Sequence, residues 1–140
     1  MNEHLKIKHN ELTAEEFKEL WESVWGDAPA PKQIKLAMEH TLFRVSVYDN
    51  EKPIAMARMI GDMGMCYYIK DVVVRPEYQK MGIGRMLIDE LLSFVNKNGI
   101  AGTDIFVELC AMPDKIPFYK KFGFDMNEAQ RLKMMYRIKE

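Results

Sequence analysis

The sequence lacks the features that mark disulfide-linked, metal-binding and membrane-spanning proteins. Its 140 residues include only two cysteines, Cys66 and Cys110. There is no Cys-x-x-Cys pair and no group of histidines at metal-ligand spacing, so neither a disulfide framework nor a metal site is expected. Both cysteines lie in apolar, strand-like runs, which predicts buried thiols without a chemical role.

Long apolar runs and an excess of charge of one sign are also missing. No stretch reaches the roughly 20 apolar residues of a membrane span, and residues 1–12 (MNEHLKIKHNEL) do not resemble a signal peptide. The 20 basic and 21 acidic side chains leave a formal charge of -1, which gives no electrostatic basis for binding nucleic acid or an anionic membrane. We therefore expect a cytoplasmic protein with neither of these partners.

Length and patterning predict one domain, residues 1–140, of mixed α and β structure. Thr13 and Glu16 form a capping-box signature before a run of apolar residues at helical spacing, and Pro31 opens a second helix. Helices are predicted at 13–25, 31–40, 82–97 and 114–121, and strands at 5–9, 42–48, 53–60, 65–74, 104–110 and 131–138. This order indicates a mixed sheet covered by helices, an α+β fold with one right-handed parallel crossover.

The most informative segment is VVVRPEYQKMGIG, residues 72–84, where an apolar strand ends and a strongly amphipathic helix begins. A helix N-terminus carries N–H groups without partners and a partial positive charge, which together bind anions. Gly82 and Gly84 lack the side chains that would keep a phosphate away from those amides. The segment is neither a P-loop nor a GxGxxG motif, since position 87 is leucine. On these residues alone, a diphosphate site and a simple tight turn both remain open.

The pattern V-x-P-x-Y-Q-x-x-G-x-G resembles the acyl-CoA signature of the GCN5-related N-acetyltransferases, the GNAT superfamily. Gln79, Gly82 and Gly84 fill its Gln/Arg-x-x-Gly-x-Gly/Ala core. The segment FYKKFGF, residues 118–124, is similar to a second family motif, F/L-Y-x-x-x-G-F. The resemblance covers the whole chain and is strongest to compact, bacterial-type members. It implies the GNAT fold: an α/β-like mixed sheet of about six to seven strands, flanked by about four helices and splayed between the strands at 65–74 and 104–110.

The resemblance also implies acetyl-CoA as the acyl donor, and no metal. In the family, main-chain amides of the glycine-rich turn bind the pyrophosphate, and the preceding strand binds the pantetheine arm through its backbone. The cofactor-binding residues that this match carries over are Val72, Val73, Val74, Gln79, Lys80, Met81, Gly82, Ile83, Gly84 and Arg85. Met112 stands where many members carry an asparagine that contacts the pantetheine, so we expect a reshaped cleft there.

Direct attack of an amine on the thioester in a ternary complex needs a base for the amine and a proton for the departing thiolate. The resemblance makes Tyr119 the candidate acid, with simple packing as the alternative. Glu108 and Asp71 interrupt apolar strands, where an unpaired carboxylate is costly, and are the candidate bases. Glu108 resembles a catalytic glutamate of ribosomal-protein acetyltransferases, although its spacing to Tyr119 is one residue shorter. Asp71 could instead anchor an ammonium or pair with Lys70 or Arg58, and water without a dedicated carboxylate is a third alternative.

These features predict an N-acetyltransferase acting on a primary amine, with a small amine such as a polyamine or an arylalkylamine preferred to a protein N-terminus or lysine. Asp71 and Glu108 favour a cationic acceptor if they face the cleft. The first two helices shape the acceptor pocket in the family, so Trp25 is a candidate for lining it. The alternatives are a non-catalytic acyl-CoA-binding or sensing module and an interaction domain with a decayed site. Homodimers through the C-terminal strands are common in the family.

Overall fold

The computed structural model describes residues 4–126, 134, 135 and 137–139. The chain divides into two compact units, Met1–Cys110 and Ala111–Glu140. Among the described residues, the first unit contains the sheet and three α-helices, and the second contains one short α-helix. Within the described residues, no helix has both the length and the apolar content needed to cross a membrane.

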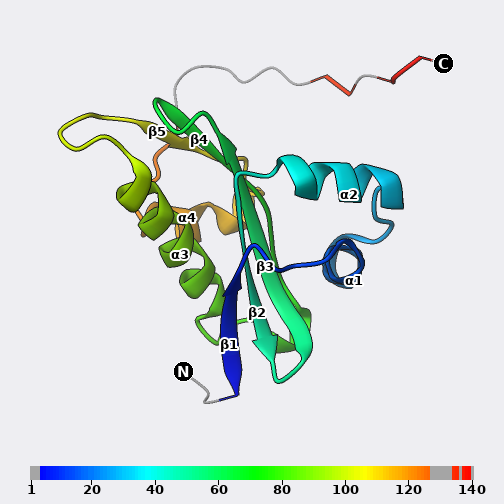
Figure 1. The fold of residues 1–140 in the computed structure, drawn as a ribbon. Coiled ribbons are helices and arrows are strands. Elements are labelled where there is room, and N and C mark those ends of the chain that lie inside the picture. Colours follow the sequence, from blue (N-terminus) through cyan, green and yellow to red (C-terminus); the bar gives the residue numbers. More distant parts are fainter. Residues whose placement is uncertain (1–3, 127–133, 136, 140) are drawn as a thin grey trace. The chain divides into compact units, whose positions relative to one another are not determined.

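A mixed sheet with strand order β1-β2-β3-β4-β5 forms the centre of the first unit (Figure 1). The first four strands pair antiparallel with their neighbours, and β5 runs parallel to β4. Their bounds are β1 Leu5–His9, β2 Phe43–Asp49, β3 Lys52–Gly61, β4 Cys66–Val74 and β5 Phe106–Glu108. The parallel pair brackets a single long helix, as the predicted crossover requires.

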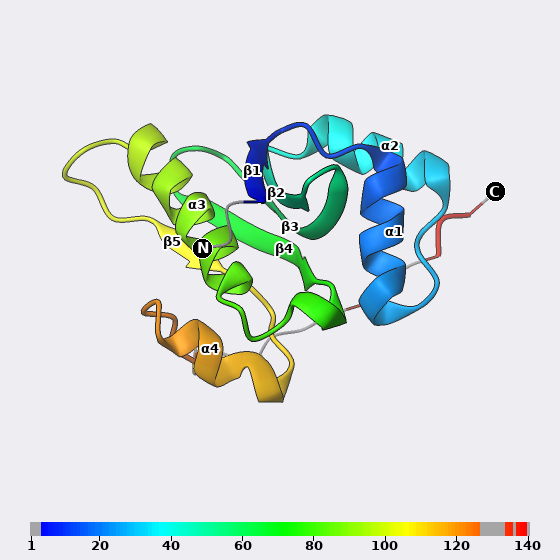
Figure 2. The same cartoon turned by 90° about the horizontal axis from the view of Figure 1, so that it is seen from below.

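Helices cover both faces of this sheet (Figures 1 and 2). α1 (Ala14–Trp25) and α2 (Pro31–His40) lie on one face, and α3 (Ile83–Asn98) lies on the other. The predicted capping box starts α1: Thr13 Oγ1 accepts from the Glu16 N–H at 3.1 Å, and Glu16 Oε1 accepts from the Thr13 N–H at 3.0 Å. Such a cap fixes where α1 begins, and so which side chains it turns toward the sheet.

Apolar side chains fill both layers between the helices and the sheet. On the α1 and α2 side, the buried cluster is Leu12, Phe17, Leu20, Ile34, Met38, Met56 and Val73. On the other side, α3 buries the stripe Ile83, Leu87, Ile88, Leu91 and Val95. Burying a side chain of this size contributes about 1.5–3 kcal/mol, so the stripe holds α3, including its N-terminus, firmly on the sheet.

β4 is bulged against β3. Lys70 pairs with Arg58 and Val73 pairs with Met56, so two residues of β4 stand opposite one residue of β3. Asp71, the first of the two, has φ of 54°, in the left-handed region that aspartate tolerates better than most residues. The bulge therefore lies at the polar residue that interrupts the apolar strand.

β4 also separates from β5. Only Cys66, Tyr67 and Tyr68 of β4 pair with β5, and from Ile69 to Val74 this edge has no partner strand among the described residues. This confirms the predicted splay. A strand edge without a partner presents main-chain N–H and C=O groups to whatever lies beside it.

The elements up to residue 98 begin and end within one residue of their predicted positions. Beyond them the predictions are less accurate: β5 covers only Phe106–Glu108, and the helix expected at 114–121 is a 3-10 turn, Pro113–Lys115, followed by α4, Ile116–Lys120. The strand predicted at 131–138 falls largely outside the described residues. Among those, the sheet has five strands instead of six to seven, and the α-helices are the four expected.

The second unit contains a small aromatic cluster. The Phe118 ring lies edge-on to Tyr119 and Phe122, with centroids 5.0 and 5.3 Å away, and Tyr119 meets Phe124 at 6.0 Å. The FYKKFGF segment therefore folds on itself through its own rings, with Gly123 at φ of 102° providing the turn.

Candidate active site

The turn between β4 and α3 is bound to the sheet through two adjacent residues, Tyr78 and Gln79. Tyr78, in the 3-10 turn Pro76–Tyr78, donates its hydroxyl hydrogen to Asp49 Oδ2 at 2.5 Å, and this bond raises the pKa of Tyr78. Gln79 Nε2 donates to the carbonyl of Val74 at 3.1 Å. Gln79 thus links the turn to Val74, the last residue of β4. Through this bond the side chain of Gln79 holds the turn in place.

α3 begins without a capping side chain. Its N-cap is Gly82, in the left-handed region at φ of 82°, and a Cβ placed there would meet no atom within 4 Å. The first helical hydrogen bond runs from the Met86 N–H to the Gly82 carbonyl, at 3.2 Å. The N–H groups of Ile83 and Gly84 therefore have no acceptor within the helix. This is the geometry of an anion site at a helix N-terminus.

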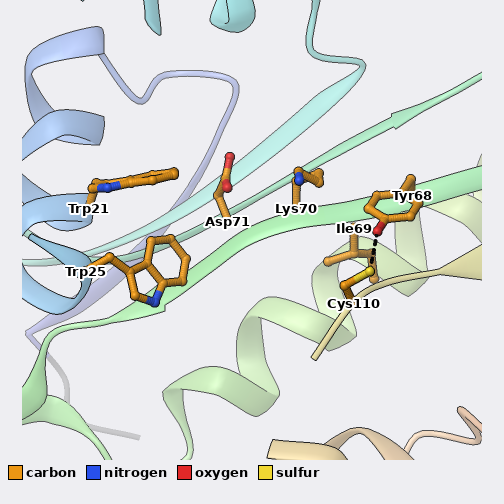
Figure 3. A pocket seen from close by; sticks show the side chains of 7 residues that line it. All are labelled: Trp21, Trp25, Tyr68, Ile69, Lys70, Asp71 and Cys110. Carbon is orange, nitrogen blue, oxygen red and sulfur yellow. Dashed lines mark hydrogen bonds between the residues drawn. The ribbon is translucent and has the colours of Figure 1, made fainter. Parts of the chain in front are cut away.

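A pocket of about 240 Å³ lies on the α1 side of β4, where β4 leaves β5 (Figure 3). Its lining residues are Trp21, Trp25, Tyr68, Ile69, Lys70, Asp71 and Cys110. The two indoles come from consecutive turns of α1 and meet edge to face, with centroids 4.8 Å apart. Trp25 is 46% exposed, which agrees with its predicted place in a pocket wall. Tyr68 donates its hydroxyl hydrogen to Cys110 Sγ at 2.9 Å at the other end of the pocket.

Asp71 is paired, and its partner is Arg58. Arg58 Nε donates to Asp71 Oδ2 at 2.5 Å, with 18% and 9% of the two side chains exposed. Arg58 Nη1 also donates to Thr41 Oγ1 at 3.2 Å. Of the alternatives for Asp71, pairing with Arg58 is therefore realised, and its carboxylate reaches the pocket with a guanidinium beside it.

Glu108 and Tyr119 occupy different surroundings. Glu108 is exposed on β5, in register with Tyr68, and it does not line the pocket. The pKa of the Cys66 thiol is raised, first by desolvation and then by the negative charge of Asp62. The charge of Glu108 adds a smaller contribution in the same direction. Tyr119 belongs to the second unit, and burial raises its pKa to about 12. Its hydroxyl therefore stays protonated across the physiological pH range.

Three other residues of the signature segment lie at the surface of the turn and of the first turn of α3. Lys80 and Met81 are exposed, and Lys80 has φ of 64°, which bends the chain into the helix. Arg85 Nε lies 3.9 Å from Asp89 on the next turn of α3. Met112 is 69% exposed and belongs to the second unit.

The prediction of buried thiols is wrong: Cys66 and Cys110 are both exposed. Cys66 is the first residue of β4, and Cys110 lies just beyond the short β5, so neither is covered by a helix. Apolar neighbours in sequence do not bury a side chain at the end of a sheet, because burial depends on what packs across that end.

Sequence reasoning predicted only Trp25 and Asp71 near the acceptor and missed five pocket residues, namely Trp21, Tyr68, Ile69, Lys70 and Cys110. One signal was present: Lys70 and Asp71 are adjacent polar residues within an apolar strand, which a regular alternation does not allow. Two such neighbours can face the same region if a bulge inserts an extra residue, as here.

Comparison with known proteins agrees with this geometry. Residues 10–124 match the model of the acetyltransferase (GNAT) family. The uncharacterised N-acetyltransferase ycf52 of Pyropia yezoensis is 32% identical over 114 residues, which cover 78% of this chain and 63% of that protein. The chloroplastic GCN5-related N-acetyltransferase 1 of Arabidopsis thaliana is 30% identical over 110 residues, 77% of this chain and 53% of that protein. The chain thus spans less than two thirds of the length of these relatives.

Solved structures show the same fold. SA2161, a probable acetyltransferase from meticillin-resistant Staphylococcus aureus, superposes with a TM-score of 0.85 at 24% identity, over 94% of this chain and 99% of that one. The ribosomal-protein-S18-alanine N-acetyltransferase of Escherichia coli gives 0.72 at 23% identity, over 90% and 79%. Since the family model covers most of the chain and the signature residues lie at the start of α3, this protein belongs to the GNAT family of acetyltransferases.

Proposed function

We propose that this protein is an N-acetyltransferase that moves an acetyl group from acetyl-CoA to the primary amine of a small molecule. One observation carries the proposal: three binding features follow one another along β4. From Ile69 to Val74 the strand has an edge that no strand of the described residues covers. Its Lys70 and Asp71 line a pocket, and it leads into the uncapped N-terminus of α3.

The residues present fit the donor. Acetyl-CoA, when bound, supplies an acetyl thioester together with a diphosphate and amide groups along its arm. The amides of Gly82, Ile83 and Gly84 suit the diphosphate, and the positive φ at Gly82 leaves the approach open. The main chain of Val72 to Val74 suits the amide groups of the arm, because this edge offers both donors and acceptors.

The chain's own residues can support acyl transfer at this point. A main-chain N–H of the Val72–Val74 edge can stabilise negative charge on the thioester oxygen. Tyr119, kept protonated by a pKa of about 12, can donate to the departing sulfur. Its role rests on the family resemblance of the FYKKFGF segment and on this protonation state.

The two carboxylates suit different roles. Asp71 is nearly buried and already accepts from Arg58, so we assign it to positioning and to the charge balance of the pocket. Glu108 is exposed and in contact with solvent, so we assign it to accepting the amine proton, directly or through water. The Glu108→Gln variant should then lower kcat with little change in the KM of the amine, whereas Asp71→Asn should chiefly raise that KM. The reverse pattern would exchange the two roles.

Two observations support a small acceptor. The pocket volume of about 240 Å³ equals the space of about eight waters, which suits a small molecule. The chloroplastic serotonin N-acetyltransferase 2 of Oryza sativa subsp. japonica is 31% identical over 90 residues, 64% of this chain and 43% of that protein. A small amine is therefore preferred to a protein N-terminus or lysine as the acceptor.

The test is release of free thiol from acetyl-CoA by the purified protein with a panel of small amines and peptides, together with calorimetry of acetyl-CoA binding. Turnover with small amines supports the proposal. Binding of acetyl-CoA without turnover on any acceptor would instead indicate a sensing module, and absence of binding would reject the donor site.

A further inference from the structure

The charges around the pocket do not cancel. Lys70 and Asp71 line it, and Arg58 is bound to Asp71 at 2.5 Å. The anionic charge of Asp71 is thus balanced by a guanidinium that is itself largely buried, and Lys70 is left as the remaining charge. The attraction between a substrate ammonium and the Asp71 carboxylate is weakened in this pocket, because the positive charge of Arg58 lies beside that carboxylate.

Lys70 is available to a ligand. Its side chain is exposed, and its Nζ lies 5.7 Å from the centre of the Tyr68 ring. Among the described residues, no carboxylate lies within 4.0 Å of Lys70 Nζ. Glu22 of α1 lies 3.9 Å from Lys18, and neither Glu22 nor Glu108 is among the residues that line the pocket. Lys70 therefore lies in a partly enclosed pocket and pairs with no carboxylate of the described residues. An ammonium in this position is a binding group for a ligand anion.

The opposite wall is aromatic. Trp25 exposes almost half of its surface, and Trp21 supports it edge to face. An exposed indole at a pocket is a surface on which an apolar or aromatic group packs. The pocket therefore offers an apolar wall on α1 and a cation on β4, close to the splayed edge.

We propose that the acceptor is an amine that also bears a carboxylate, namely an amino acid with an apolar or aromatic side chain. Lys70 binds the carboxylate, Trp25 and Trp21 pack against the side chain, and the amino group is left to face the splay of β4 and β5. This assignment rests on the proposed N-acetyltransferase function and names its substrate class. It sets the acceptor apart from carboxylate-free arylalkylamines and from polyamines.

The protein carries its own probe for this pocket. Its sequence has two tryptophans, Trp21 and Trp25, and both line the pocket, so intrinsic fluorescence reports directly on occupancy. L-phenylalanine and phenethylamine differ only by the carboxylate, and L-leucine and isoamylamine form a second matched pair. Titration of each compound gives Kd without acetyl-CoA, and thiol release with acetyl-CoA gives kcat/KM.

In the wild type we expect L-phenylalanine to bind about fivefold to tenfold more tightly than phenethylamine, and kcat/KM to follow the same order. Lys70→Met should remove this difference by weakening the binding of L-phenylalanine, and Lys70→Arg should restore most of it. Lys97→Met, which removes an exposed lysine from the last turn of α3, is the matched control and should keep the wild-type ratio.

The proposal is overturned if phenethylamine equals or exceeds L-phenylalanine in the wild type, if Lys70→Met keeps the ratio, or if no amino acid changes the fluorescence. These outcomes differ from failure of the proposed function. Turnover of amines without a carboxylate preference leaves the acetyltransferase standing and rejects the role of Lys70. Amino-acid binding that depends on Lys70, with no thiol release on any acceptor, supports the carboxylate site and rejects acetyl transfer.

Discussion

Arg58 Nε donates to Asp71 Oδ2 at 2.5 Å, across the point where β4 is bulged against β3. Arg58 also donates to Thr41 Oγ1, and Thr41 donates to the Ala37 carbonyl at the end of α2. One guanidinium thus links two strands and a helix end. The link holds Asp71 in its left-handed conformation at the wall of the pocket.

Removing one partner of this ion pair should cost more than removing both. Arg58→Met leaves the nearly buried Asp71 carboxylate uncompensated and should lower the free energy of unfolding by about 2–4 kcal/mol. Adding Asp71→Asn should recover part of that loss, because an amide is less costly to bury than an unpaired carboxylate. Urea unfolding of the four members of the cycle measures the coupling, and strictly additive losses would contradict a strong pair.

Gly82→Glu should abolish acetyl-CoA binding. The substitution places a side chain and a negative charge in front of the amides of α3, where the diphosphate is proposed to bind. Gly102→Glu is the matched control: Gly102 also has φ of 82° and open space around its Cβ direction, but it lies in the loop after α3. Calorimetry should show lost affinity in the first variant only. Equal affinity in both would place the diphosphate elsewhere.

Tyr119→Phe should lower kcat about tenfold to a hundredfold and change the Kd of acetyl-CoA little, because only the hydroxyl that donates a proton is removed. The ring contacts with Phe118 and Phe124 are kept in this variant. The wild-type profile should show no loss of this donor up to about pH 11, since the pKa of Tyr119 is about 12. Unchanged steady-state kinetics would leave Tyr119 a packing residue.

Asp62 should make stability depend on pH at the acidic end. Its Oδ1 accepts the N–H groups of Gly64, Met65 and Cys66 at 2.9, 2.8 and 3.1 Å, which lowers its pKa from 3.8 to about 2. Because the folded pKa is depressed, this contribution is complete above about pH 4 and is lost as pH falls toward 2. The difference in unfolding free energy between wild type and Asp62→Asn should therefore grow from pH 2 to pH 4 and stay constant above. A difference that does not vary with pH would contradict it.

Local signals in the sequence were enough for most of the fold. The capping box at Thr13, the apolar stripe of α3 and Gly82 each act on their immediate neighbours, so their consequences can be predicted from short stretches. The resemblance of two motifs then indicated the splay and the family, which the structure and the comparisons confirm.

The rest depends on contacts between distant residues. The pairing of Asp71 with Arg58, the exposure of Cys66 and Cys110, and the shortness of β5 follow from which elements pack together. Composition along a strand carries no information about these partners. The roles of Glu108 and Tyr119 remain predictions, since they need acceptor and donor in place.

The single extra residue of the β4 bulge places a core residue and a pocket residue on the same side of the sheet. Lys70 and Val73 are three positions apart, so in a regular strand they would project to opposite sides of the sheet. The bulge restores them to a common side: Val73 packs among the apolar residues beneath α1 and α2, and Lys70 borders the pocket. An unbulged strand of the same length would turn one of the two to the α3 side of the sheet, so that the protein would keep either this hydrophobic layer or this wall of the pocket, but not both.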